Sequence, residues 1–273
     1  MRSSLICKLL VVASVLVGSF VSTPGADAQT APALNEIKSR KELRVGWAVF
    51  YPYVYLNPQT KKISGFAADF MEAMSTSLNV KLVWVEDSWA TLTAGLQANK
   101  YDMTIPGVAI TMPRAEVVTF SKPVAKMPLG LLVKKGGAQD LKSWKDLDQS
   151  GKRITTTLGS VVDLFASKRF EKAEIIRVKA GPDSIAQLMA NKADAWANGL
   201  EGLAMIQKEH PDLVIVPGEF GVNPICIAFK QGDLVTRDYV NLFIDDLRRT
   251  GVLKTMVEKH GLYAWSEAES ESQ

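Results

Sequence analysis

The stretch GFAADFMEAMSTSLNVKLVWVEDSWATLTAGLQANKYDMTIPGVAITMPRAEVVTFSKP, residues 65–123, says most about the fold. Apolar residues recur at helical spacing over 66–78, and residues 81–85 alternate as a strand. A second helical pattern over 89–98 and a second strand over 103–108 follow. This order predicts a parallel βαβ layout and an α/β fold. The loop at 107–114 then follows the carboxyl end of a strand, where open α/β sheets bind their ligands.

Two Pro- and Gly-containing segments, 121–130 and 217–223, interrupt the later chain and predict two crossings between lobes. Helix and strand patterns alternate on both sides of these segments. We therefore expect residues 29–125 and 220–265 to form lobe 1 and residues 126–219 to form lobe 2. A cleft between two such lobes is a favoured place for a ligand.

Both ends of the chain are expected to lie outside the lobes. A basic start, an apolar run over 9–21 and the sequence Ala-Asp-Ala at 26–28 predict a signal peptide, residues 1–28, cleaved after Ala28. An uncleaved membrane anchor is the alternative, but the apolar run is shorter than the ~20 residues that a membrane span needs. The expected location is the periplasm. The acidic, serine-rich tail at 266–273 is expected to be disordered.

Charge and composition exclude several function classes. The chain has 32 Lys and Arg against 29 Asp and Glu and no basic block, so nucleic acid is not an expected partner. Beyond the predicted signal peptide the single cysteine is Cys226, in an apolar run that predicts burial. His210 and His260 are far apart, which leaves no zinc-ligand spacing. We expect no metal or cofactor, and a monomer.

Four short motifs at a characteristic spacing carry a resemblance. They are GF-x2-DF at 65–70, W-x2-L-x2-GLQ-x2-KYD at 89–102, G-x-x-I-T-x-x-R at 107–114 and F-S-K-P at 120–123. In this order they resemble the first lobe of the family 3 bacterial extracellular solute-binding proteins, periplasmic receptors for amino acids and related polar solutes that supply ABC importers. Weaker similarity continues to about Leu262. The resemblance implies a two-lobed, type II periplasmic-binding fold.

The resemblance also implies a ligand site in lobe 1. The arginine at the position of Arg114 holds the ligand carboxylate in relatives, and a guanidinium can bind a carboxylate through two parallel hydrogen bonds. The alternative is a surface arginine paired with Glu116. Gly107 would allow close approach of the backbone, and the N–H groups of Ala109 and Thr111 are candidate donors.

Lobe 2 and the aromatic residues complete the expected site. Gly159 and Ser160 lie at a strand-to-helix turn, where relatives use Gly-Thr or Gly-Ser and where a helix N-terminus favours anions. An ordinary N-cap serine is the alternative. Tyr51 and Trp89 match stacking aromatics of relatives, and Trp47 and Tyr53 lie near them in the sequence. Core packing is the alternative for each aromatic residue. Asn198 is expected in the cleft.

Three positions depart from the family pattern. Amino-acid receptors usually carry acidic residues where this chain has Ala48 and Gly199, and a Ser or Thr where it has Ala109. The two acidic groups normally hold the ligand ammonium. The candidate substitutes are Glu201, Asp87 and Glu86, although solvated surface charges are the alternative for all three. The ligand is therefore either an amino acid held by a substitute such as Glu201 or Asp87, or a carboxylate without an ammonium group, such as an aromatic or keto acid.

These features predict a periplasmic receptor for an amino acid or related small carboxylate. The ligand would bind Arg114 in the open form, the lobes would close on Ser160, and the closed form would dock on an ABC transporter permease. An exported cyclohexadienyl dehydratase acting on prephenate or arogenate is the alternative, but no catalytic dyad, triad or metal set is evident. The sensor domain of a signalling protein is a third interpretation, disfavoured because no membrane span or kinase segment follows the lobes.

Overall fold

A computed structural model describes residues 31–265. Residues from Pro32 onward belong to one compact unit. The predicted signal peptide and the predicted disordered tail both lie outside the described residues.

The first sheet has five strands and forms the base of lobe 1. Strand β1 lies beside both β4 and β5, and these neighbours are parallel to it, as the βαβ prediction requires. The returning strand β14 is antiparallel to β5 and β7. The order is β4 (Lys81–Glu86), β1 (Glu42–Trp47), β5 (Met103–Thr104), β14 (Ala228–Lys230) and β7 (Val118–Phe120).

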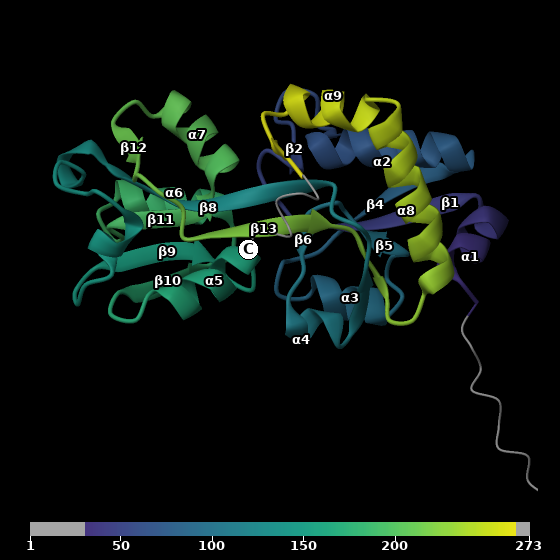
Figure 1. The fold of residues 1–273 in the computed structure, drawn as a ribbon, viewed down its shortest axis with the longest axis horizontal. Coiled ribbons are helices and arrows are strands. Elements are labelled where there is room, and N and C mark those ends of the chain that lie inside the picture. The colour runs from purple at the N-terminus through teal and green to yellow at the C-terminus, as the bar shows by residue number, and fades with distance from the viewer. Residues whose placement is uncertain (1–30, 266–273) are drawn as a thin grey trace, which may run out of the picture. The chain divides into compact units, whose positions relative to one another are not determined.

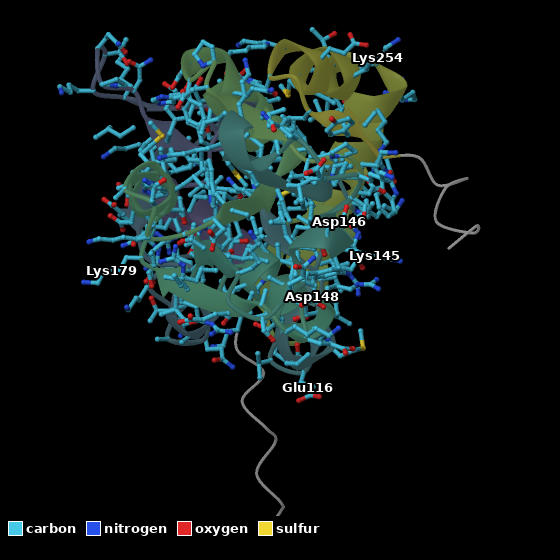
Figure 2. All side chains as sticks on the ribbon, turned by 90° about the vertical axis from the view of Figure 1, so that its left-hand side faces the viewer. Glu116, Lys145, Asp146, Asp148, Lys179 and Lys254 are labelled. Atoms are coloured by element: carbon cyan, nitrogen blue, oxygen red, sulfur yellow. The ribbon has the colours of Figure 1, made fainter. Side chains whose placement is uncertain are left out.

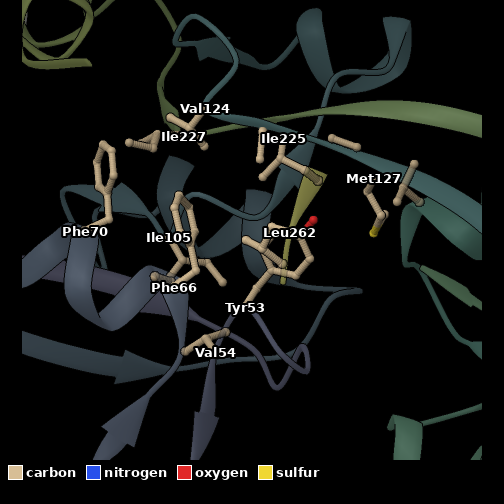
Figure 3. Packing of buried hydrophobic residues seen from close by; sticks show 14 of the residues in the cluster. Tyr53, Val54, Phe66, Phe70, Ile105, Val124, Met127, Ile225, Ile227 and Leu262 are labelled. Carbon is tan, nitrogen blue, oxygen red and sulfur yellow. The ribbon is translucent and has the colours of Figure 1, made fainter. Parts of the chain in front are cut away.

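Helices cover both faces of this sheet. The main core packs helices α1, α2, α8 and α9 against one face, while the smaller cluster around Leu92 and Leu96 of α3 packs on the other. Figure 1 shows α2 and α9 on one side and α3 on the opposite side. Figure 3 shows Phe66 and Phe70 of α2 turned toward Ile105 and Ile227 in the core. The helices are α1 (Ala33–Arg40), α2 (Phe66–Leu78), α3 (Leu92–Gln97), α8 (Leu234–Arg249) and α9 (Val252–Lys259).

The second sheet has eight strands, forms the base of lobe 2 and extends through β13, β6 and β15 into lobe 1. Strand β9 is parallel to β10 and β11, whereas β8 is antiparallel to all its neighbours. The main path is β10 (Glu174–Val178), β9 (Arg153–Thr157), β11 (Ala195–Gly199), β8 (Ala125–Lys134), β13 (Gly221–Cys226) and β6 (Val108–Ala109). Strands β12 (Leu213–Ile215) and β15 (Tyr263–Ala264) pair with β8.

Three helices enclose the second sheet. Buried Val162 and Ala166 of α5 belong to the main core, whereas Leu188 of α6 and Leu203 of α7 pack with Trp196 in a separate cluster. These helices are α5 (Val161–Arg169), α6 (Gly181–Met189) and α7 (Leu200–Glu209). The short elements are β2 (Tyr55–Leu56), β3 (Ile63–Ser64), α4 (Met112–Ala115), η1 (Lys135–Gly137) and η2 (Trp144–Leu147).

Two long antiparallel strands connect the lobes. Strands β8 and β13 pair from Ala125 with Ile225 to Leu129 with Gly221, and Figure 1 shows them side by side between the two sheets. The crossing segments predicted at 121–130 and 217–223 fall at the starts of these strands. Pro128 lies within β8 and Pro224 within β13, and the two strands remain paired at both positions. The lobe boundaries at 125/126 and 219/220 stay predictions.

Local differences from the sequence prediction have identifiable causes. The helix expected over 89–98 begins at Leu92, because the Asp87 carboxylate accepts hydrogen bonds from the N–H of Ser88 and the hydroxyl of Thr91 and holds this segment as a turn. The strand expected over 103–108 is split into β5 and β6, and Pro106 lies in the break.

The surface of the described residues carries mixed charge. Figure 2 shows charged side chains of both signs, among them Glu116, Lys179 and Lys254, reaching outward from the ribbon. Cys226 is buried, as predicted, and its burial raises the pKa of the thiol to about 12. Within residues 31–265 no helix combines the length and the apolar character that a membrane span requires.

Candidate ligand site

A cavity of about 410 Å³ lies between the two lobes. Its volume is within the range typical of small-molecule sites. Lobe 1 contributes Val49, Phe50, Tyr51, Tyr55, Leu56, Pro58, Trp89, Gly107, Ala109 and Arg114. Lobe 2 contributes Thr156, Thr157, Ser160, Val161, Val162, Gly181, Pro182, Ile185, Trp196, Asn198, Gly202, Ile206 and Glu209.

Arg114 is placed in the cavity by the short helix α4. The hydroxyl of Thr111 caps this helix by accepting from the N–H of Arg114 at 3.4 Å. The guanidinium donates to two backbone carbonyls, Ala109 O at 3.2 Å and Gly159 O at 2.9 Å. Burial lowers the pKa of Arg114, and within the described chain no carboxylate forms an ion pair with it. Glu116 does not pair with it, and Figure 2 shows Glu116 directed outward at the edge of the molecule.

The strand-end loop before Arg114 forms the adjacent wall. The N–H of Gly107 donates to Ile105 O and Cys226 O, and Ala109 pairs with Ile225 of β13. Gly107 and Ala109 both line the cavity, whereas Thr111 does not. Thr111 therefore acts on the site indirectly, by fixing the helix that carries Arg114.

On lobe 2, the turn before α5 supplies a hydroxyl. Ser160 is the N-cap of α5, and its Oγ accepts from the N–H of Asp163 at 3.2 Å. Its backbone N–H donates to Thr157 O at 3.1 Å, so the hydroxyl proton is the donor left for a ligand. The Asp163 carboxylate accepts from the N–H of Gly159 and pairs with Arg177. The helix N-terminus is thus already partly neutralised by a protein carboxylate.

Aromatic residues form the side wall of the cavity. Phe50 and Trp89 meet edge to face with their centroids 5.4 Å apart, and the Trp89 indole N–H donates to Val49 O. Tyr51 and Tyr55 pack with their centroids 4.3 Å apart. Trp47, in contrast, is 4% exposed and belongs to the core behind β1. The resemblance indicated Tyr51 and Trp89, which line the cavity, but it did not single out Phe50. The prediction of Trp47 from its neighbouring position was wrong, because its side chain packs in the core.

Further polar groups reach the cavity from lobe 2. Asn198 lines it from the end of β11, next to the buried Trp196. Thr156 also lines it, and its buried Oγ1 has no hydrogen-bond partner among the described residues. Sequence reasoning missed Thr156, Trp196 and Glu209. Residues 195–197 are Ala-Trp-Ala, and an apolar run without alternation does not indicate which side chain faces the cleft.

The candidate substitute carboxylates lie outside the lining. Glu201 is buried in the first turn of α7, where its Oε1 accepts from the Tyr53 hydroxyl at 2.7 Å and its Oε2 has no described partner. Burial raises the pKa of Glu201 to about 7 and raises that of Tyr53 well above its usual value. The Asp87 carboxylate accepts from Ser88, Thr91 and Tyr101.

Close contacts join the lobes around the cavity. Besides the Arg114–Gly159 and Tyr53–Glu201 hydrogen bonds, a Cβ built on Gly159 would lie 2.9 Å from Ala90 Cα. Gly159 also has a positive φ of 72°, which glycine adopts without strain. The lobes are therefore closed on each other. Among the described residues, no group of three or more His, Cys, Asp or Glu side chains could hold a metal ion.

Two α/β lobes, two connecting strands and a cleft between the lobes define a solute-binding protein of the type II periplasmic-binding fold. The profile of the bacterial extracellular solute-binding proteins, family 3, matches residues 43–263. The chain belongs to this family.

Three similar proteins illustrate the range of the family. A probable amino-acid ABC transporter periplasmic-binding protein of Sinorhizobium fredii is 26% identical over 253 residues, 89% of this chain and 83% of the relative. A cyclohexadienyl dehydratase of Pseudomonas aeruginosa is 25% identical over 246 residues, 86% of this chain and 88% of the relative. The crystal structure of an ancestral amino acid-binding protein, a precursor of cyclohexadienyl dehydratase, has a TM-score of 0.78 and 27% identity, and covers 84% of this chain and 99% of its own.

Proposed function

We propose that this protein is a periplasmic receptor that captures an amino acid or related small carboxylate and delivers it to an ABC transporter permease. One observation carries the proposal: the half-buried Arg114 guanidinium faces the cavity between the lobes and, among residues 31–265, hydrogen-bonds only to carbonyl groups. A desolvated cation without a counter-charge is costly, and a ligand carboxylate would provide that counter-charge. The names of the relatives support an amino-acid-type ligand.

The proposed mechanism is ligand-induced closure. A carboxylate would bind Arg114 in place of the carbonyl of Gly159 and would accept from the Ser160 hydroxyl on the opposite lobe. Because the ligand then contacts both lobes only when they are closed, it shifts the population toward the closed form. Thr156 and Asn198 would provide further hydrogen bonds, and Phe50 and Trp89 would hold the apolar part of the ligand.

An exported dehydratase is a weaker candidate for this chain. General acid catalysis requires a proton donor within hydrogen-bond reach of the substrate, and the candidate carboxyl of Glu201 is buried and is not among the residues that line the cavity. The one carboxylate that does line it among the described residues, Glu209, is exposed. We therefore propose binding without chemistry. Incubation with prephenate and ultraviolet detection of phenylpyruvate is the corresponding test, and turnover would favour the enzyme.

A thermal-shift screen tests the receptor proposal. The protein is unfolded, stripped of ligand and refolded, and then heated with the twenty amino acids, their keto-acid counterparts, aromatic carboxylates and small sugars. A ligand at a hundred times its Kd should add ~2.7 kcal/mol to the free energy of unfolding. We expect a rise in Tm with at least one carboxylate. A rise with sugars alone, or with nothing, would contradict the proposal.

A further inference from the structure

The charges that line the cavity are few and unequal. Of the described lining residues only Arg114 and Glu209 are charged. Arg114 is half-buried, whereas Glu209 is exposed at the end of α7. Burial raises the pKa of Tyr51 most, and the neighbouring Tyr55 and the negative charge of Glu209 raise it further. Because Glu209 lines the cavity and is also exposed, it lies at the solvent-facing rim.

No lining group can neutralise an ammonium beside the ligand carboxylate. Gly107, Ala109 and Ser160 lie around Arg114 in the lining and carry no charge. The nearby acids Glu201 and Asp87 lie outside the lining. Glu201 is buried and accepts from Tyr53 through one oxygen, and Asp87 accepts within its own turn. Burying an ammonium with only neutral partners is strongly unfavourable, because the cation loses its hydration without a counter-ion.

The remaining lining is largely apolar. Aromatic side chains come from both lobes, with Phe50 and Trp89 on one side and Trp196 on the other. Aliphatic side chains fill the space between them: Val49, Leu56, Val161, Val162, Ile185 and Ile206. Such walls favour a flat aromatic or branched aliphatic group. The rim carboxylate of Glu209 disfavours a second anionic group on the ligand, because like charges repel.

We propose that the cavity selects a monocarboxylate with an aromatic or branched apolar body and no ammonium group on the carbon next to the carboxylate. This inference rests on the proposed function and narrows its ligand class, from amino acids and related acids to 2-oxo, 2-hydroxy or unsubstituted acids. Arg114 holds the carboxylate, and the aromatic walls hold the body. The selectivity arises from the absence of a lining carboxylate near Arg114.

Matched ligands test this selectivity by isothermal titration calorimetry on refolded, ligand-stripped protein. The first set is phenylpyruvate, 3-phenyllactate and 3-phenylpropionate against L-phenylalanine; the second is 4-methyl-2-oxovalerate against L-leucine. We expect at least one acid to bind at least ~100-fold more tightly than its amino-acid counterpart. Equal or tighter binding of the amino acids would overturn the inference and leave the receptor proposal intact. Binding of no carboxylate at all would overturn both.

A variant with an added carboxylate in the lining tests where the selectivity against the ligand ammonium arises. Asn198→Asp changes the shape of a lining side chain little and places a carboxylate in the cavity. We expect it to reduce the preference for the oxo acid over the amino acid by at least ~10-fold, because the ligand ammonium gains a counter-ion. Glu86→Gln, at an exposed residue outside the lining, is the control and should leave the ratio unchanged. An unchanged ratio in Asn198→Asp would contradict the proposed origin of the selectivity.

Discussion

Glu201 should make the stability of this protein depend on pH. Its carboxyl is 4% exposed and bridges the lobes through the hydrogen bond from Tyr53. Burial raises its pKa from 4.5 to about 7, although the hydrogen bond from Tyr53 acts in the opposite direction. The second oxygen, Oε2, has no described partner. Desolvation therefore outweighs hydrogen bonding at this carboxyl, and the neutral form is favoured in the folded protein.

The size and the sign of the effect follow from this shift. A shift of about 2.5 pKa units from 4.5 to about 7 corresponds to about 3 kcal/mol at 1.36 kcal/mol per unit. Because the pKa is raised on folding, the contribution of Glu201 is fully present below pH 4.5 and is lost as the pH rises through 7. Wild-type protein should therefore lose about 3 kcal/mol of stability from this group between pH 4.5 and pH 8.

Urea denaturation followed by tryptophan fluorescence measures the effect. The free energy of unfolding is compared between wild type and Glu201→Gln at several pH values from 5 to 8. We expect the variant to show a flatter dependence, with the difference growing toward pH 8. Glu86→Gln, at an exposed residue, is the control and should follow the wild type. Parallel curves for wild type and Glu201→Gln would show that Glu201 does not cause the pH dependence.

Two further predictions concern closure and the unpartnered hydroxyl. Gly159→Val should weaken carboxylate binding, measured by calorimetry, and enlarge the radius of gyration of the ligand-saturated protein. A side chain at this position would clash with Ala90 across the lobes and would be strained by the positive φ. Unchanged affinity would show that the lobes need not approach each other at Gly159. Thr156→Val should raise the Tm of the ligand-free protein by ~2–4 °C, since a buried hydroxyl without a partner costs about 1 kcal/mol; a lower Tm would mean that the hydroxyl has a partner.

The sequence predicted the long periodic elements best. The helical stripes at 66–78 and 234–249 coincide with α2 and α8, because apolar spacing over several turns leaves little choice of structure. The turn at Ser160 was also predicted, since a serine before an apolar run is a strong N-cap signal. Short elements were less predictable. At residues 88–91 the Asp87 carboxylate accepts hydrogen bonds from Ser88 and Thr91, and the helix begins only at Leu92.

The site was predictable mainly through the family resemblance, which also indicated Tyr51 and Ser160 outside the four motifs. Arg114 and Trp89 were singled out by their motifs and line the cavity. Phe50 and Trp196 were not, because local sequence does not distinguish an aromatic residue in the core from one beside a cleft. The Tyr53–Glu201 contact joins residues 148 positions apart, and no local pattern encodes such a pairing.

The most direct test of the account is the role of Arg114. Calorimetry with the most tightly binding carboxylate from the screen compares the Kd of wild type with that of Arg114→Ala. Arg153→Ala is the control, because Arg153 pairs with Asp194 and neither residue lines the cavity. Loss of charge-assisted hydrogen bonds worth ~3 kcal/mol should raise the Kd at least ~100-fold in Arg114→Ala and leave it unchanged in Arg153→Ala. Near-wild-type affinity in Arg114→Ala would place the carboxylate site elsewhere and contradict the account.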